Sequence, residues 1–576
     1  MQKNLILVFI LTFVVIILAQ KYFFKAPQPP AGEPQEKQQI QTQAPAKEAP
    51  APQAQAAAAK PATAPSAQNA AVKQATSEGE TVVENDLYRI VFTNKGAQVK
   101  SWVLKKYNDS EGKPLELVHQ KGSEQYGYPL SFWTWDQGLR EKLNTALYVT
   151  DAGAQLKTPG TLSFEYSDGN LVVRKSFEFS DSYVIGVKTS VEQNGKYVTA
   201  LPSWPTGFGD MSVPATYAAQ RIDYYNGDKV ERLSSDKKGA KISNGRVVQG
   251  TLQWAGAVDQ YFAAIFLPDN PQQAAMAELR SGIEIPKDPK KPENKETFKV
   301  ELLGVAVGAL DAPVNTRLFV GPKAVNVLES VHPASGQGDL RAVVDFGMFS
   351  FIARPLFIWL QWTYQHWVSN WGWAIIILTV IINVVLMPLR IISMRSALKM
   401  QRVAPQVQSI NDKYKKYSLK DPRRAEAQKE IAALYKEHNV NPVGGCFPLL
   451  LQMPFLFAFW AMLSAAIELR GAHWFWLKDL AQPDHLYIIP IVIVVSTMLM
   501  QKMTPQAGMN PEQARMMNMM MPLMLGFMSW SVASGLGLYW LTGTVVAIAQ
   551  QWGMNQTSLG REIRQEMEKR ARKAKK

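Results

Sequence analysis

Five strongly apolar stretches in the last third of the 576-residue chain constrain its fold more than any other feature. Such runs are typical of membrane-spanning helices, because a helix satisfies its own backbone hydrogen bonds inside a bilayer. The sequence therefore predicts a multi-pass membrane protein. The expected spans cover residues 371–389, 446–467, 486–500, 516–532 and 536–549.

The N-terminal part of the chain has two segments of very different composition. Residues 1–25 hold an apolar run between Lys3 and Lys21 without the small residues of a signal-peptide cleavage site, so we expect an uncleaved signal-anchor helix. Residues 26–80 are rich in Pro, Ala and Gln. They predict a disordered linker, because they contain too few large apolar side chains to form a core.

Residues 81–338 show the pattern of a β-rich domain. Asp168-Gly169-Asn170 separates two strand-like runs in the manner of a hairpin, and helical periodicity is weak throughout. We therefore expect a large β-sandwich. In residues 339–369, apolar positions recur every three or four residues beside several tryptophans, which predicts an amphipathic helix in the membrane interface. The whole chain thus predicts a multi-domain membrane protein with a five-helix transmembrane core, an N-terminal anchor helix and a β-sandwich domain.

Charge predicts how the chain crosses the membrane. Residues 390–440, expected to form a helical hairpin, hold twelve Lys or Arg against five Asp or Glu. The tail, residues 553–576, holds eight against three. Basic segments beside spans stay in the cytoplasm. With the anchor counted, six spans place both termini in the cytoplasm and the β domain outside.

Enzyme chemistry has no support in the sequence. The six histidines are scattered, Cys446 is the single cysteine, and neither a phosphate-binding loop nor a G-x-S-x-G motif is present. We expect no enzyme activity, no cofactor and no bound metal.

Mild polarity inside the spans is more informative. Thr379 and Asn383 are four residues apart and share a helix face, and Arg390 falls on that face again near the cytoplasmic end. Two interpretations remain open. The polar groups could simply bond to neighbouring helices, or they could line a polar cleft open to the cytoplasm.

A long motif carries a family resemblance. Residues 441–454, Asn-Pro-Val-Gly-Gly-Cys-Phe-Pro-Leu-Leu-Leu-Gln-Met-Pro, closely resemble the signature of YidC-type membrane protein insertases, the Oxa/Alb/YidC family. Supporting matches are Asn370-Trp371-Gly372, Gln501-Lys502-Met503-Thr504-Pro505 and the Ser534–Trp540 segment. The anchor, linker and β domain resemble the long Gram-negative form, whose β domain is periplasmic.

The resemblance implies a mechanism and a set of substrate-groove residues. Nascent hydrophobic segments would slide along a hydrophilic groove into lipid without nucleotide, while their polar flanks are held inside. Thr379 and Gln452 match polar groove positions of the family, and Tyr539 and Trp540 match an aromatic pair that contacts substrate. Many members carry a groove Arg where this chain has Asn383. We expect Arg390 to supply part of that positive potential.

The resemblance and the charges also imply partners and a location. We expect nascent membrane proteins as substrates, the Sec translocon as a partner, and a place in the bacterial inner membrane. The basic tail and the cytoplasmic loop suit the ribosome or anionic lipid rather than DNA. Two alternatives are a small-solute transporter and a cell-envelope sugar-binding membrane protein, but the sequence shows neither an internal repeat nor clustered acids or histidines in the β domain.

Overall fold

The computed structural model describes residues 71–576 except 110–111, 212–213, 236–241, 288–295, 337, 415–416, 418–420, 441–446, 504–510, 559, 563–564 and 566–576. The described chain forms two compact units, one ending at Val343 and the other beginning at Val344. The predicted anchor at 1–25, most of the predicted linker and most of the basic tail lie outside the described residues.

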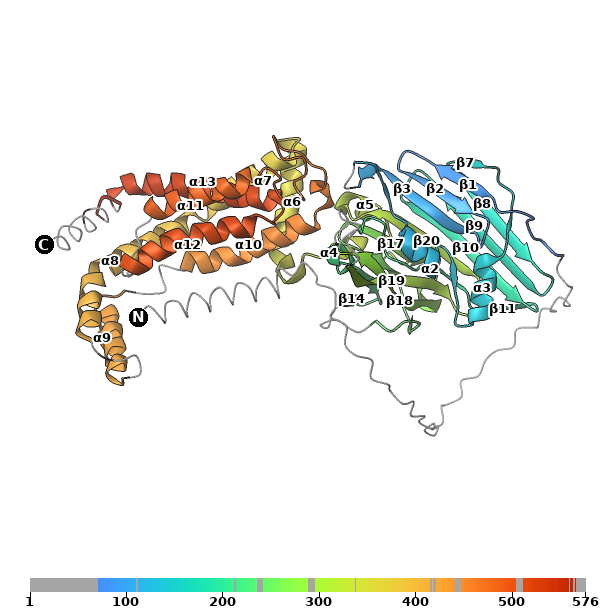
Figure 1. Ribbon diagram of the computed structural model, residues 1–576, viewed down its shortest axis with the longest axis horizontal. Coiled ribbons are helices and arrows are strands. Elements are labelled where there is room, and N and C mark those ends of the chain that lie inside the picture. The colour runs from blue at the N-terminus through green and yellow to red at the C-terminus, as the bar shows by residue number, and fades with distance from the viewer. Residues whose placement is uncertain are drawn as a thin grey trace. The chain divides into compact units, whose positions relative to one another are not determined.

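The first unit contains three β-sheets and four short helices (Figure 1). In spatial order, one sheet holds β4 (Pro114–Glu116), β3 (Gln98–Asn108), β2 (Tyr88–Thr93), β1 (Glu80–Glu84) and β7 (Gln155–Lys157). The largest holds β14 (Val230–Ser234), β13 (Arg221–Tyr225), β16 (Trp254–Val258), β17 (Phe262–Pro268), β20 (Val314–Pro322), β10 (Val184–Gln193), β9 (Leu171–Phe179), β8 (Gly160–Ser167) and β6 (Val149–Thr150), with β11 (Lys196–Tyr197) beside β10. The third holds β15 (Val247–Gln249), β18 (Ala274–Pro286), β19 (Thr297–Ala309), β12 (Leu201–Trp204) and β5 (Phe132–Trp133). The helices are α2 (Gln120–Tyr126), α3 (Gln137–Thr145), α4 (Pro214–Tyr217) and α5 (Val325–Glu329), and a 3-10 turn, η1 (Pro271–Gln273), precedes β18.

The β-rich prediction is confirmed, and the β8–β9 hairpin shows why it was accessible from sequence. Alternate residues of β9 are buried, as a half-buried strand requires. The Asp168 carboxylate accepts hydrogen bonds from the backbone N–H groups of Asn170 and Leu171, and Gly169 takes the left-handed φ of 97° that the turn needs. The core between the sheets is aromatic: Phe92 of β2 packs against Phe177 of β9, with ring centroids 5.0 Å apart.

Two predicted boundaries of the β domain need correction. Residues 71–79 do not behave as part of a free linker, because Lys73 and Ser167 exchange backbone hydrogen bonds and the Asn94 side chain bonds the backbone of Ser77 and Gly79. The predicted interfacial helix at 339–369 begins too early. Its first residues form a 3-10 turn, η2 (Leu340–Val343), whose Leu340 and Val343 are buried in the β unit. Composition shows neither effect, because both depend on partners distant in sequence.

The second unit is helical. Its elements are η3 (Gly347–Phe349), α6 (Ser350–His366), α7 (Trp371–Val385), α8 (Met387–Tyr414), α9 (Arg423–Glu437), α10 (Phe447–Ala465), η5 (Ile467–Leu469), α11 (Ile488–Met503), α12 (Pro511–Ser529) and α13 (Ser534–Gln556). Helix α13 packs between α7 and α11, α12 packs on α11, and α10 packs on α6. Helices α8 and α9 pack together as a hairpin that buries Val403 and Tyr414 of α8 and Ala427 of α9.

The five expected spans fall on α7, α10, α11, α12 and α13, with shifted ends. Helix α7 stops at Val385 rather than at residue 389, because the chain breaks at Leu386 before Pro388. Helix α13 continues to Gln556, past the predicted end at 549. Within the described residues, no helix has both the length and the apolar character needed to cross a membrane. That these helices cross a membrane therefore stays a prediction.

Candidate functional site

The polar residues of α7 are held by the helix itself. The N-cap Asn370 accepts hydrogen bonds from the N–H groups of Gly372 and Trp373, which fixes where the helix begins. Two turns on, the Thr379 hydroxyl donates to the carbonyl of Ile375 at 2.6 Å, and the Asn383 amide donates to the carbonyl of Thr379 at 2.8 Å. Thr379 is fully buried and Asn383 is 5% exposed. Their donor groups are therefore satisfied within the helix.

Arg390 joins this group from α8. Its Nη2 donates to Oδ1 of Asn383 at 3.1 Å, across the short break between α7 and α8. The side chain is half-buried, and no acidic side chain in the described part of the chain forms an ion pair with it. A guanidinium carries five N–H donors. Because the Asn383 amide oxygen engages one of these donors, the guanidinium of Arg390 is held in place while its other N–H groups can bind an acceptor on another molecule.

Helix α13 packs against α7 beside these residues. Gly543 brings its backbone close to α7: a Cβ at this position would lie 3.9 Å from both Thr379 and Asn383. One turn earlier, Tyr539 is buried and stacks on Phe459 of α10 with ring centroids 4.1 Å apart. Further along, the Gln550 amide donates to the carbonyl of Asn383 at 3.0 Å.

The structure thus brings together four of the six residues that we predicted, which we call the Asn383 cluster. Hydrogen bonds join Thr379, Asn383 and Arg390, and Tyr539 lies one turn before Gly543 in α13. Trp540 is half-buried on the next face of α13, and no described contact joins it to the cluster. Gln452 lies in α10, and its side chain is outside the described residues. Sequence reasoning missed Gln550 and Phe459. Gln550 lies seven residues beyond Gly543 on one α13 face, but the expected span stopped one residue before it.

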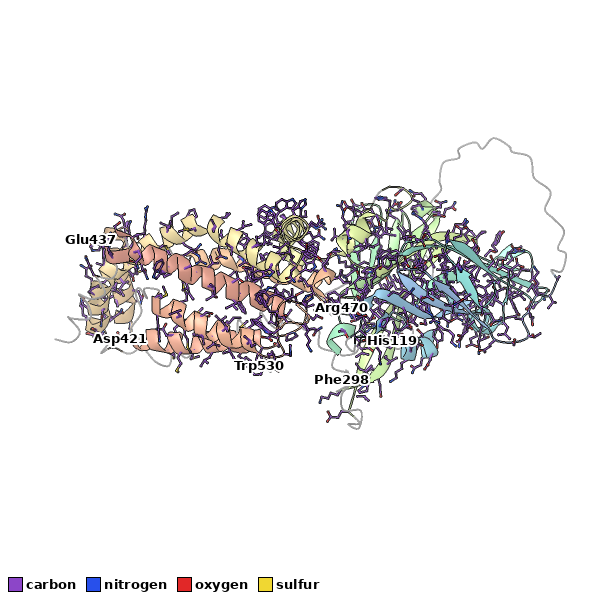
Figure 2. The ribbon with its side chains drawn as sticks, turned by 90° about the horizontal axis from the view of Figure 1, so that it is seen from above. His119, Phe298, Asp421, Glu437, Arg470 and Trp530 are labelled. Atoms are coloured by element: carbon purple, nitrogen blue, oxygen red, sulfur yellow. The ribbon has the colours of Figure 1, made fainter. Side chains whose placement is uncertain are left out.

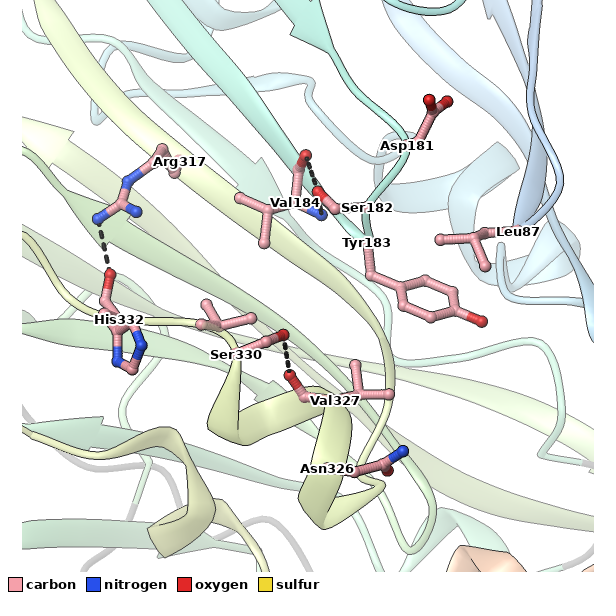
Figure 3. A pocket seen from close by; sticks show the side chains of 11 residues that line it. Leu87, Asp181, Ser182, Tyr183, Val184, Arg317, Asn326, Val327, Ser330 and His332 are labelled. Atoms are coloured by element: carbon pink, nitrogen blue, oxygen red, sulfur yellow. Dashed lines mark hydrogen bonds between the residues drawn. The ribbon is translucent and has the colours of Figure 1, made fainter.

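The β unit offers a cavity of about 470 Å³ (Figure 3). Its lining includes Asp181, Tyr183, Arg317 and His332, and Arg317 is engaged with the carbonyl of His332 at 2.9 Å. Among the described residues, no group of three or more His, Cys, Asp or Glu side chains could hold a metal ion.

His119 of the β unit has a structural role that its contacts explain. Its Nδ1 accepts from the N–H of Gly122 at the start of α2, and its Nε2 bonds the hydroxyl of Tyr217. Burial lowers the pKa of His119 below its ordinary value. The neutral ring caps a helix and ties it to α4.

Comparison with known proteins identifies both units. Residues 362–561 match the family model described as 60Kd inner membrane protein, and residues 80–359 match the YidC periplasmic domain. The Membrane protein insertase YidC of Pelobacter propionicus is 32% identical over 498 residues, covering 83% of this chain and 86% of the relative. The same-named protein of Cupriavidus necator is 30% identical over 499 residues, covering 83% and 82%. A solved structure titled "Active YidC insertase crystal structure with the first transmembrane domain resolved" is 17% identical, covers 83% of this chain and 94% of its own, and has a TM-score of 0.35.

The matched units define the class: an inner membrane protein with a helical C-terminal unit and a β-rich periplasmic domain. The chain belongs to the YidC family of membrane protein insertases.

Proposed function

We propose that this chain moves nascent transmembrane segments from the cytoplasm into the inner membrane through a polar groove open to lipid, and then aids their folding. The observation that carries the proposal is the half-buried guanidinium of Arg390, held in place by Asn383 and without an acidic partner among the described side chains. An unpaired cation in an apolar helical unit is costly, and such residues generally mark a pathway.

Each member of the Asn383 cluster has a role in this proposal. Arg390 binds an acidic or polar flank of the substrate by charge-assisted hydrogen bonds. Thr379 and Asn383, which are buried and bonded within α7, hold Arg390 in position, and Tyr539 packs beside them. Outside the cluster, Gln452 would offer a further polar contact and Trp540 would contact the apolar segment. A charged residue at the bilayer centre costs about 2.5–3.5 kcal/mol on insertion scales. The groove offsets part of that cost, and burial of the apolar segment in lipid drives the reaction without a nucleotide cofactor.

The membrane arrangement follows from the charges. We place both termini, the α8–α9 hairpin and the basic tail in the cytoplasm, with five spans in the region of α7 and α10–α13 and a sixth near the N-terminus. The hairpin and tail, with net charges of +7 and +5 over residues 390–440 and 553–576, would meet the ribosome or anionic lipid. The chain would act alone or with the Sec translocon.

Two other functions have less support. A solute transporter would need ionisable groups or paired half-helices at membrane depth, whereas the cluster holds one cation near one end. A sugar-binding membrane protein could use the β-unit cavity, yet the Arg317 guanidinium in its lining already bonds a backbone carbonyl. The insertase family is not a family of enzymes.

Reconstitution into liposomes tests the proposal. A short single-span substrate with an acidic translocated flank should insert faster into liposomes that contain this protein than into empty ones. Protease protection of the flank measures insertion. Equal rates in the two preparations would refute the proposed function.

A further inference from the structure

The loop between α10 and α11 ends in an exposed aromatic turn. Trp474 and Leu477 exchange backbone hydrogen bonds of 2.8 and 2.9 Å, so Phe475 and Trp476 form the turn between them. Phe475 has a φ of +47° and its side chain is 71% exposed. Left-handed turn positions normally hold Gly, Asn or Asp. A bulky apolar residue exposed in such a conformation breaks two local preferences at once, which is typical of functional positions.

The turn is fixed rigidly to the start of α7. Trp474 lies directly over Gly372, where a Cβ would come within 2.3 Å of the indole ring, so only glycine fits. The Asn370 side chain donates to the carbonyl of His473 at 3.0 Å. Trp373 packs edge-on against Trp474 and Phe475, with centroids 5.8 and 5.9 Å away. We call Trp373, Trp474, Phe475 and Trp476 the aromatic tip.

The aromatic tip lies at a defined end of the helical unit. It joins the end of α10 to the start of α11, beside the start of α7. Figure 2 shows Arg470 and Trp530 at this end, whereas Asp421 and Glu437 of the α8–α9 hairpin lie at the other. Further exposed rings follow on α6 and just after it, where Trp362 is 45% and Trp367 is 55% exposed. The rings therefore gather at the end opposite the basic hairpin.

We propose that the aromatic tip is a lipid anchor, seated in the headgroup and upper acyl region of the periplasmic leaflet. Tryptophan and other amphipathic rings favour this interface because they join an apolar body to a polar edge. Continuity with the exposed rings of α6 favours a lipid surface over a small protein patch as the occupant. The anchor holds the start of α7, and with it the depth of the Asn383 cluster, relative to the bilayer. This inference rests on the membrane location proposed above.

Depth-dependent quenching tests the anchor in the full-length protein. Cys446 is the only cysteine, so a Cys446→Ser background with Phe475→Cys gives one site for an NBD fluorophore. Nitroxide lipids labelled near the headgroup should quench it more strongly than lipids labelled deep in the acyl chain, and aqueous iodide should quench it weakly. Quenching by iodide without quenching by lipid overturns the anchor, as does protection from both, which would indicate a protein partner such as the β unit.

A second labelled site separates failure of the anchor from failure of the membrane location. Val495, in the middle of α11, is 61% exposed, and NBD at Val495→Cys should respond most to the deep nitroxide. Loss of lipid quenching at both sites would remove the membrane location itself. Loss of lipid quenching at residue 475 alone would refute the anchor and leave the membrane location standing. A final experiment moves the NBD label to Lys478→Cys so that residue 475 itself can be varied. Phe475→Asn keeps a residue that suits the turn but removes the ring, and it should abolish quenching by the headgroup-labelled lipid. Phe475→Trp should retain that quenching. Unchanged quenching in Phe475→Asn also counts against the proposal.

Discussion

Replacing Arg390 by alanine tests the proposed role of the Asn383 cluster most directly. The change removes the guanidinium that bonds Asn383 and leaves the backbone of α8 intact. We expect insertion of a substrate with an acidic flank to slow, and insertion of a substrate with a neutral flank to change little. The difference between the two substrates isolates the charge from any general loss of stability.

The contacts of Arg390 set how much insertion of the acidic substrate should slow. A hydrogen bond to a charged group contributes about 1.5–3 kcal/mol. If the acidic flank makes one such bond to Arg390 in the rate-limiting state, its loss slows insertion roughly 10- to 150-fold, since about 1.4 kcal/mol is a factor of ten. Because Arg390 is only half-buried, solvent screening favours the lower end of this range. High salt should shrink the difference further.

The assay is insertion into liposomes, with Arg395→Ala as the matched control. Arg395 is an exposed cation about one turn further along α8. Arg395→Ala therefore removes one positive charge from the same helix without touching Asn383. A rescue follows from the family pattern: Arg390→Ala combined with Asn383→Arg returns a guanidinium to the position that many relatives use and should restore insertion of the acidic substrate. Equal slowing of acidic and neutral substrates by Arg390→Ala, or equal effects of Arg390→Ala and Arg395→Ala, would refute the reasoning.

Three further changes test the packing of the two units. Gly372→Ala drives a methyl group into Trp474 and should destabilise the helical unit by about 1–3 kcal/mol, which lowers its unfolding temperature in detergent. The control Gly553→Ala, whose Cβ meets nothing within 4 Å, should not lower the unfolding temperature. Lys175→Met removes an ammonium group that donates to the carbonyls of Gly96, Ala97 and Leu130, and should cost the β unit roughly 1–3 kcal/mol; an unchanged urea midpoint would contradict this role. His119 has a pKa lowered by burial, so below its ordinary value of 6.5 the unfolded chain binds the proton first, and the stability of the β unit falls with falling pH. His119→Asn, measured by urea unfolding from pH 7.5 to 5.5, should flatten that dependence, and an equally steep fall in the variant would contradict it.

Local signals predicted most of the β unit and the helices. The β8–β9 turn was predictable because Asp168 bonds residues only two and three positions away. The N-terminus of α7 was similarly marked by Asn370, which caps its own helix. The stretch just before the first strand and the end of the β unit were placed less well, since Lys73 pairs with Ser167 and Arg221 bonds the carbonyl of Val343, both far along the chain. Composition windows carry no information about such partners.

The sequence predicted that Arg390 and Asn383 lie on the same side, but the reason for that prediction is only partly correct. A seven-residue spacing places two side chains on one face of a continuous helix. In the structure, α7 ends at Val385 and α8 begins at Met387, so no single helix joins them. The contact survives because the break is short and the flexible guanidinium reaches back across it. Gln550 was missed because the apolar pattern of its helix fades before the helix ends.

The contacts of Asn383 also explain why its identity and that of Arg390 belong together. Its Nδ2 donates to Thr379, its Oδ1 accepts from Arg390, and its backbone carbonyl accepts from Gln550. An arginine at 383 has no acceptor atom and could not hold the guanidinium of Arg390; the two cations would repel. An amide at 383 therefore fits a chain whose positive charge comes from residue 390 and is held at 3.1 Å from the Asn383 Oδ1 atom. We expect the acidic flank of a substrate to meet this positive charge beside Asn383, at the break between α7 and α8.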